Sequence, residues 1–145
     1  MIALIQRVVE ASVRVEGEVT GRIGAGLLAL IGVERNDHEG NAMRLLERVL
    51  TYRVFGDDAG RMNLSLLDTG GGLLLVPQFT LAADTRKGTR ASFSCAAAPE
   101  RARELFDHLV AHARTRCADV QTGVFGADMA VASINHGPVT FRLDA

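Results

Sequence analysis

The sequence predicts an α+β fold in which mostly antiparallel β-sheets form a barrel-like core and two helices flank it. Three observations predict this class. The N-terminal part consists of apolar, β-branched segments, two later segments have the apolar spacing of helices, and the tail returns to strand-like alternation. With 145 residues, the chain is expected to form one domain, residues 1–145, that buries a sizeable core.

The first strands are expected in the N-terminal part. Residues 2–9, 12–23 and 26–34 are rich in Val, Ile and Leu, and Gly and Glu-Gly turn signals punctuate them. Val13 and Val15 alternate with charged neighbours, which is the period of two typical of a half-buried strand. These segments therefore indicate the beginning of a meander or a barrel.

Two amphipathic helices are predicted to cover the sheet. The first spans residues 38–50, and the second begins near Pro99, because proline suits the first position of a helix. Their apolar stripes consist of Ala42, Leu45, Leu46, Val49 and Leu50 in the first helix, and of Leu105, Phe106, Leu109, Val110 and Ala113 in the second.

The segment LLLVPQFT begins like a buried strand and ends on polar residues. Because proline has no N–H for a sheet ladder, the strand must lie at an edge or reach the end of its ladder at Pro77. Gln78, Phe79 and Thr80 are then free to line an opening. An ordinary strand terminus with local capping is the alternative.

The C-terminal tail, residues 128–145, is predicted to form two strands. Asn135, His136, Gly137 and Pro138 are expected to join them as a turn, in which a trans Gly–Pro bond is the commoner form.

Composition and motifs narrow the function classes. The net charge of −1 argues against a protein that coats nucleic acid, and the absence of a leader or a long apolar run predicts a cytoplasmic protein. Common hydrolase, metalloprotease and nucleotide-binding motifs are missing. His108 and His112 have the spacing of a zinc helix but lack its Glu, so no metal is expected; Cys95 and Cys117 are read as buried or idle thiols.

Four stretches carry a specific resemblance: MIALIQRV, LLLVPQFTLAADTRKG, FGADM and NHGPVTF. In this order and at these intervals, they make the chain resemble the bacterial and eukaryotic D-aminoacyl-tRNA deacylases over nearly its full length. The resemblance implies a homodimer that needs no cofactor and hydrolyses the ester between a D-amino acid and the 3′ end of tRNA, as a proofreading step in translation.

The resemblance also implies site residues. Those matching Gln78, Phe79 and Thr80 line the catalytic pocket, and those matching Phe125 and Met129 lie near the terminal adenosine. An aminoacyl ester is already reactive, so positioning of its carbonyl and backbone N–H donors can suffice without a nucleophilic triad.

Chiral selection is implied at a separate motif. In the family, a cis Gly–Pro loop matching Gly137 and Pro138 enters the partner subunit's pocket, and an arginine matching Arg7 helps to hold it. Such a rigid wall would exclude an L side chain, and since glycine has no side chain to exclude, glycyl-tRNA is expected to be cut as well.

Further expectations concern the basic loop and two departures from the family pattern. Arg86, Lys87 and Arg90 are candidates for contacts with tRNA phosphates, or else form a solvated loop. The family often has Ser where this chain has Pro77, and often an acidic residue at His136. Pro77 also occurs in a related group that removes L-alanine, so two alternatives are a deacylase of relaxed specificity and a noncatalytic protein that binds tRNA 3′ ends.

Overall fold

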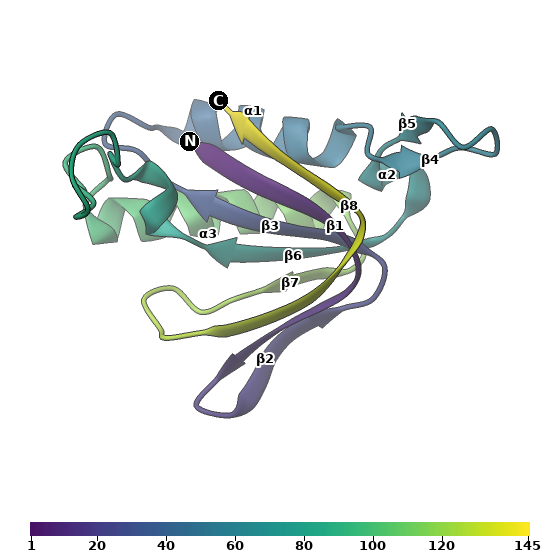
Figure 1. The fold of residues 1–145 in the computed structure, drawn as a ribbon, viewed down its shortest axis with the longest axis horizontal. Helices are drawn as coiled ribbons and strands as arrows, with labels where there is room; N and C mark the ends of the chain where they lie inside the picture. Colours follow the sequence, from purple (N-terminus) through teal and green to yellow (C-terminus); the bar gives the residue numbers. More distant parts are fainter.

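A long N-terminal strand, β1 (Ile2–Val15), organises the sheet in the computed structural model, which describes residues 1–145 (Figure 1). Its first half pairs antiparallel with β3 (Gly26–Gly32), and its second half pairs antiparallel with β2 (Glu18–Ile23). The two-residue turn at Glu16 and Gly17, both with positive φ, closes the hairpin between β1 and β2.

The other strands extend and curl this sheet. β6 (Gly72–Pro77) lies parallel to β3, and β7 (Val120–Thr122) lies parallel to β6. β2 reaches back to contact β6 and β7, so the sheet is nearly closed into a barrel. Gly21 permits this approach, because a Cβ there would lie 2.7 Å from the carbonyl oxygen of Thr122.

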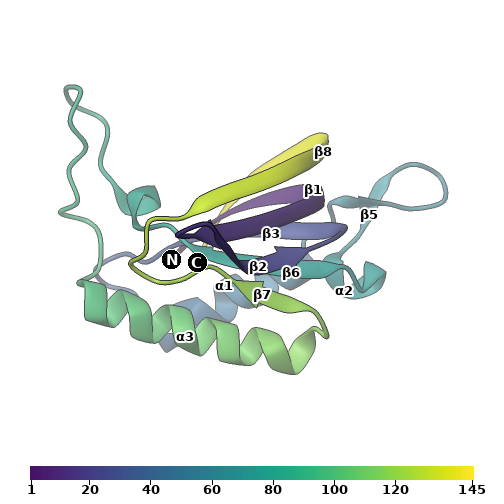
Figure 2. The same cartoon turned by 90° about the horizontal axis from the view of Figure 1, so that it is seen from below.

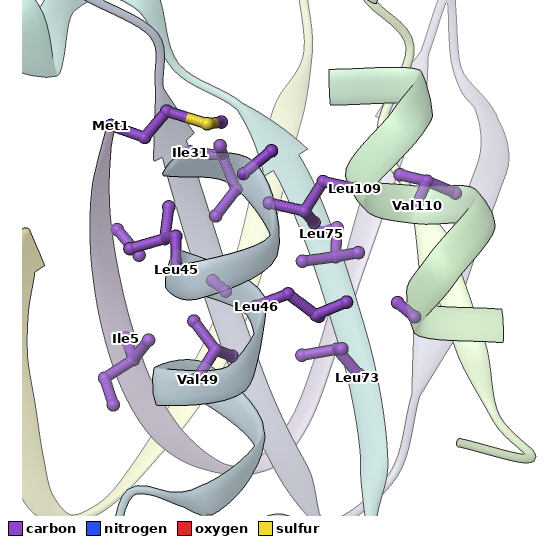
Figure 3. Close-up of a cluster of buried hydrophobic side chains, with 14 of the residues drawn as sticks. Met1, Ile5, Ile31, Leu45, Leu46, Val49, Leu73, Leu75, Leu109 and Val110 are labelled. Carbon is purple, nitrogen blue, oxygen red and sulfur yellow. The ribbon is translucent and has the colours of Figure 1, made fainter. Parts of the chain in front are cut away.

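The two long helices, α1 (Glu39–Thr51) and α3 (Pro99–Arg116), pack on one face of the sheet (Figure 2). All ten residues predicted for their apolar stripes are buried, which confirms both stripes. With the facing strand residues they belong to a cluster of 24 buried residues (Figure 3). Leu27 and Ile31 of β3 point into it, whereas Leu28 points into a second cluster of seven residues inside the curled sheet. Strand β3 is therefore apolar on both faces.

The predicted turn in the tail is wrong. The tail forms one continuous strand, β8 (Ala130–Asp144), that runs antiparallel to β1 along its whole length. Gln6 pairs with Thr140 and Val8 pairs with Asn135, so the residues between these partners in β8 bulge outward opposite Arg7. The Gly–Pro signal thus marks a bulge within a strand, since long-range pairing with β1 overrides the local turn preference.

The predicted break between the first two strand segments is also wrong, because β1 continues through residues 10 and 11. Short elements were not predicted: β4 (Phe55–Gly56), β5 (Met62–Leu64), α2 (Leu66–Thr69) and the 3-10 turn η1 (Phe79–Ala82), together with β7. None of the helices combines the length and apolarity needed to cross a lipid bilayer.

Candidate active site

An apolar cavity of about 610 Å³ opens where β6 ends. Pro77 makes the last pair of the ladder with β3, opposite Ile31, and the ladder with β7 has already ended at Leu75. The strand therefore reaches its ladder end at the proline, as predicted. The backbone N–H of Gln78 donates to the carbonyl of Ile31 at 2.7 Å, and the chain then turns into η1 along the cavity.

The residues after Pro77 present different groups to the cavity. Gln78 and Phe79 belong to its lining, and the Gln78 side-chain amide donates a hydrogen bond to the Thr80 hydroxyl beside it. Phe79 is 59% exposed and forms a tilted aromatic pair with Phe93, with 5.0 Å between ring centroids. The cavity mouth is thus aromatic, and Gln78 is the one polar side chain of the lining, whereas Thr80, which was also predicted to line the pocket, lies outside that lining.

The opposite wall is the loop that carries Phe125 and Met129. The Phe125 ring packs against Phe106 of α3, with centroids 6.4 Å apart, and the Arg103 guanidinium lies 5.0 Å from the Phe125 ring centroid. The Met129 sulfur accepts a hydrogen bond from the backbone N–H of Val124 at 3.3 Å. Both sequence-predicted residues of this loop lie in the same lining as Gln78 and Phe79.

The residues predicted for chiral selection lie together outside the cavity lining: Arg7, Gly137 and Pro138. Arg7 Nε donates to the carbonyl of His136 at 3.1 Å, and its Nη1 donates to the carbonyl of Val54 at 2.6 Å. Gly137 has φ +118°, and a Cβ there would lie 2.8 Å from Arg7 Nη2, so only glycine suits this position. The Gly137–Pro138 bond is cis, both residues are exposed, and neither lines the cavity of its own chain.

The basic loop divides into paired and unpaired cations. Asp84 and Ser92 close its base through two backbone hydrogen bonds of 2.8 and 3.0 Å. Arg86 binds the Asp84 carboxylate with two nitrogens, at 2.9 and 2.6 Å, and these hydrogen bonds lower the pKa of Asp84 and raise that of Arg86. Lys87 and Arg90 form no ion pair and line a second cavity of about 480 Å³.

Histidine and cysteine side chains form no metal site. His112 Nδ1 lies 2.9 Å from the His108 carbonyl oxygen, and no group of three or more His, Cys, Asp and Glu side chains is placed to hold an ion. Both cysteines are free, as expected, but Cys95 is exposed rather than buried. Cys117 is half-buried, and its burial raises the pKa of its thiol.

The sequence analysis does not identify two residues of the site, Phe93 and Arg103. Phe93 follows the basic loop directly, and an aromatic residue between polar ones in such a loop is a signal that could have identified it. Arg103 lies 22 positions before Phe125 and looks like any solvated arginine of an amphipathic helix. Only the packed structure reveals its contact.

Comparisons with known proteins give a consistent result. The family described as D-Tyr-tRNA(Tyr) deacylase matches residues 4–144. A D-aminoacyl-tRNA deacylase of Thioalkalivibrio sulfidiphilus (strain HL-EbGR7) is 68% identical over 144 residues, which covers 99% of this chain and 97% of that protein. A D-aminoacyl-tRNA deacylase of Escherichia coli O1:K1 / APEC is 59% identical over 143 residues, which covers 99% of this chain and 99% of that protein.

Solved structures share the fold. A c-Myc DNA Unwinding Element Binding Protein superimposes with a TM-score of 0.95 at 34% identity and covers 100% of this chain and 99% of its own. A structure described as a "probable eukaryotic D-amino acid tRNA deacylase" has a TM-score of 0.88 at 16% identity, covering 99% of this chain and 98% of its own, and supports the fold alone.

Proposed function

The chain belongs to the D-Tyr-tRNA(Tyr) deacylase family and is a hydrolase acting on D-aminoacyl-tRNA, and we propose that it releases both D-amino acids and glycine while it spares L-amino acids. The observation that supports the site is the apolar cavity at the end of β6, with Gln78 and Phe79 on one wall and Phe125 and Met129 on the other. Such a cavity fits an adenosine that carries an esterified amino acid. Because aminoacyl-tRNA is used in the cytoplasm, we expect the protein to act there.

In this proposal, the terminal adenosine lies against Phe125 and Met129, and the ester carbonyl lies against the backbone of Gln78, Phe79 and Thr80. A water molecule attacks the carbonyl carbon, and backbone N–H groups stabilise the negative charge that develops on its oxygen. The bond to the ribose oxygen then breaks, and the free amino acid and the tRNA with its hydroxyl leave. The hydrogen bond from Gln78 to Thr80 supports the geometry of this segment.

Pro77 fits a reaction without a side-chain nucleophile. Its side chain consists only of carbon, where a serine would place a hydroxyl at the cavity lining, so in this proposal catalysis depends on positioning and on backbone donors. The alternative is relaxed specificity: if Pro77 alters the pocket, L esters will be cut as well.

The selection against L-amino acids is proposed to come from a second copy of the chain. Gly137 and Pro138 project from a bulge of β8 that lies outside the cavity of its own chain, so they can act on an ester only in a partner's cavity. β8 also exposes apolar side chains that do not line the cavity: Ile134 is 54% and Phe141 36% exposed. A partner subunit would cover this surface.

The first experiment compares D-Tyr-tRNA, L-Tyr-tRNA and glycyl-tRNA as substrates, at substoichiometric enzyme and without added metal. Rapid loss of the D and glycyl esters, with the L ester spared, is the expected result. Hydrolysis of the L ester would establish relaxed specificity and make Pro77→Ser the next variant. Absence of all turnover, with retained affinity for a nonhydrolysable aminoacyl-adenosine, would indicate a noncatalytic binder.

A second experiment tests the contribution of the partner subunit. Gln78→Ala and Pro138→Ala chains are denatured, mixed and refolded together, alongside each variant alone. If the Gly–Pro bulge acts in the partner's cavity, a mixed dimer holds one site with both groups intact, so D-selective hydrolysis reappears. If the bulge acts within its own chain, no intact site forms and the mixture only averages the two variants.

A further inference from the structure

The Phe79–Phe93 pair is an exposed aromatic surface at the mouth of the proposed active site. Phe79 is 59% and Phe93 44% exposed, and the two rings lie 5.0 Å apart. Most other large apolar residues near the cavity, such as Val76 and Phe106, are buried. Because both rings line the cavity and remain exposed, the pair lies at the rim of the cavity.

Free positive charge lies next to this aromatic surface along the chain. Phe93 follows Ser92 directly, and Ser92 lines the cavity that Lys87 and Arg90 also line. The backbone pairing of Asp84 with Ser92 closes the loop that carries Lys87 and Arg90. Phe93 therefore follows directly after the closed end of this loop. Arg86 is engaged by Asp84, which leaves Lys87 and Arg90 as the cations available to an anion.

Aromatic rings beside free cations are the chemistry that binds single-stranded nucleic acid. Bases stack on the rings, and lysine or arginine neutralises the phosphates. The cavity itself has room for one nucleoside and its amino acid, while the tRNA chain must continue outward over the rim.

We propose that Phe79 and Phe93 form the stacking site for the base of the nucleotide that precedes the terminal adenosine, with Lys87 and Arg90 facing the adjoining phosphates. The inference rests on the proposed function, since the direction of the RNA chain follows from an adenosine in the cavity. It adds a second nucleotide site at the rim of the cavity, which accounts for the exposure of two phenylalanines.

Binding of two nonhydrolysable ligands tests this site independently of catalysis. One ligand is adenosine with a D-amino acid attached through a 3′-amide, and the other is the cytidylyl-adenosine dinucleotide with the same amide. We expect the wild-type protein to bind the dinucleotide about 5- to 100-fold more tightly, the range that base stacking produces. Phe93→Ala should abolish this difference, with a much smaller loss of affinity for the mononucleoside than for the dinucleotide, and Phe93→Trp should retain the difference.

Matched variants separate stacking from other roles. Leu67→Ala removes a side chain that is 38% exposed on α2, far from the cavity lining, and should change neither affinity. Lys87→Ala and Arg90→Ala should each lower the affinity for the dinucleotide and not that for the mononucleoside. This loss of affinity should be smaller at high salt.

Three results would overturn the inference. Equal wild-type affinities for the two ligands would exclude a second nucleotide site. An equal loss of affinity for both ligands in Phe93→Ala would assign Phe93 to binding of the terminal nucleoside alone. Dissociation of a dimer by Phe93→Ala in light scattering would mean that the rings pack against a second copy. If the mononucleoside itself does not bind the wild-type protein, the proposed function fails first.

Discussion

The two apolar regions of this molecule serve opposite purposes. Between the sheet and the helices, Leu45, Leu75 and Leu109 are fully buried (Figure 3). At the end of β6, Phe79 and Phe93 remain exposed around a cavity. Burial in the first region stabilises the fold, whereas exposure in the second leaves apolar surface for a ligand to cover.

The change from one region to the other occurs at one residue. Residues 73–76 of β6 are buried between β3 and β7, and the ladder ends at Pro77. The next residues are free of the ladder and turn along the cavity. A variant in the first region should therefore change stability, and one in the second should change substrate handling.

Leu109→Ala should give the largest effect, and it lies in the buried region. Leu109 is fully buried in α3, so truncation leaves a cavity and should lower the free energy of unfolding by about 2–5 kcal/mol. Urea denaturation measures this loss. The hydrolysis rate per folded molecule should stay near wild type; a selective loss of rate with unchanged stability would contradict the division between the regions.

Pro138→Ala should give the next effect, in the exposed region. The residue is exposed, so stability should change little, whereas the ratio of hydrolysis rates for D-Tyr-tRNA and L-Tyr-tRNA should fall by about tenfold, as expected when an excluding contact is lost. Thr140→Ala, on the same strand and also exposed, is the control. An unchanged ratio in Pro138→Ala would count against selection by this motif.

The sequence predicted the buried region better than the exposed one. All ten residues that helical periodicity assigns to the two apolar stripes are buried, because the pattern is local, and of the buried residues of α1 and α3 only Ala102 was not predicted. The tail was misread since Gly137–Pro138 is a local turn signal, while the long pairing with β1 depends on residues more than a hundred positions away. Pro77 was placed at a ladder end from its missing N–H, but Phe93 and Arg103 joined the site only through packing.

Arg103→Ala should have a smaller effect on the exposed region. Its guanidinium lies over the Phe125 ring and donates to the Phe125 carbonyl at 3.4 Å, so it holds the cavity wall in place. Its loss should raise KM about two- to fivefold, with kcat nearly unchanged. Arg101→Ala is the matched control, since Arg101 is on the same helix but pairs with Glu104. A similar KM change in both variants would assign the effect to net charge.

Arg86→Ala should have the smallest effect, although Arg86 looks like a phosphate ligand in the sequence. Its guanidinium is already engaged by the Asp84 carboxylate, so its removal should change tRNA affinity less than Lys87→Ala does at the same salt concentration. The pair lowers the pKa of Asp84, so its contribution is present above the usual carboxyl pKa and is lost as the pH falls through the lowered value. At neutral pH the pair therefore stays intact. A filter-binding titration in which Arg86→Ala weakens tRNA as much as Lys87→Ala would show that Arg86 exchanges Asp84 for phosphate, and the exposed region would then rearrange when it binds.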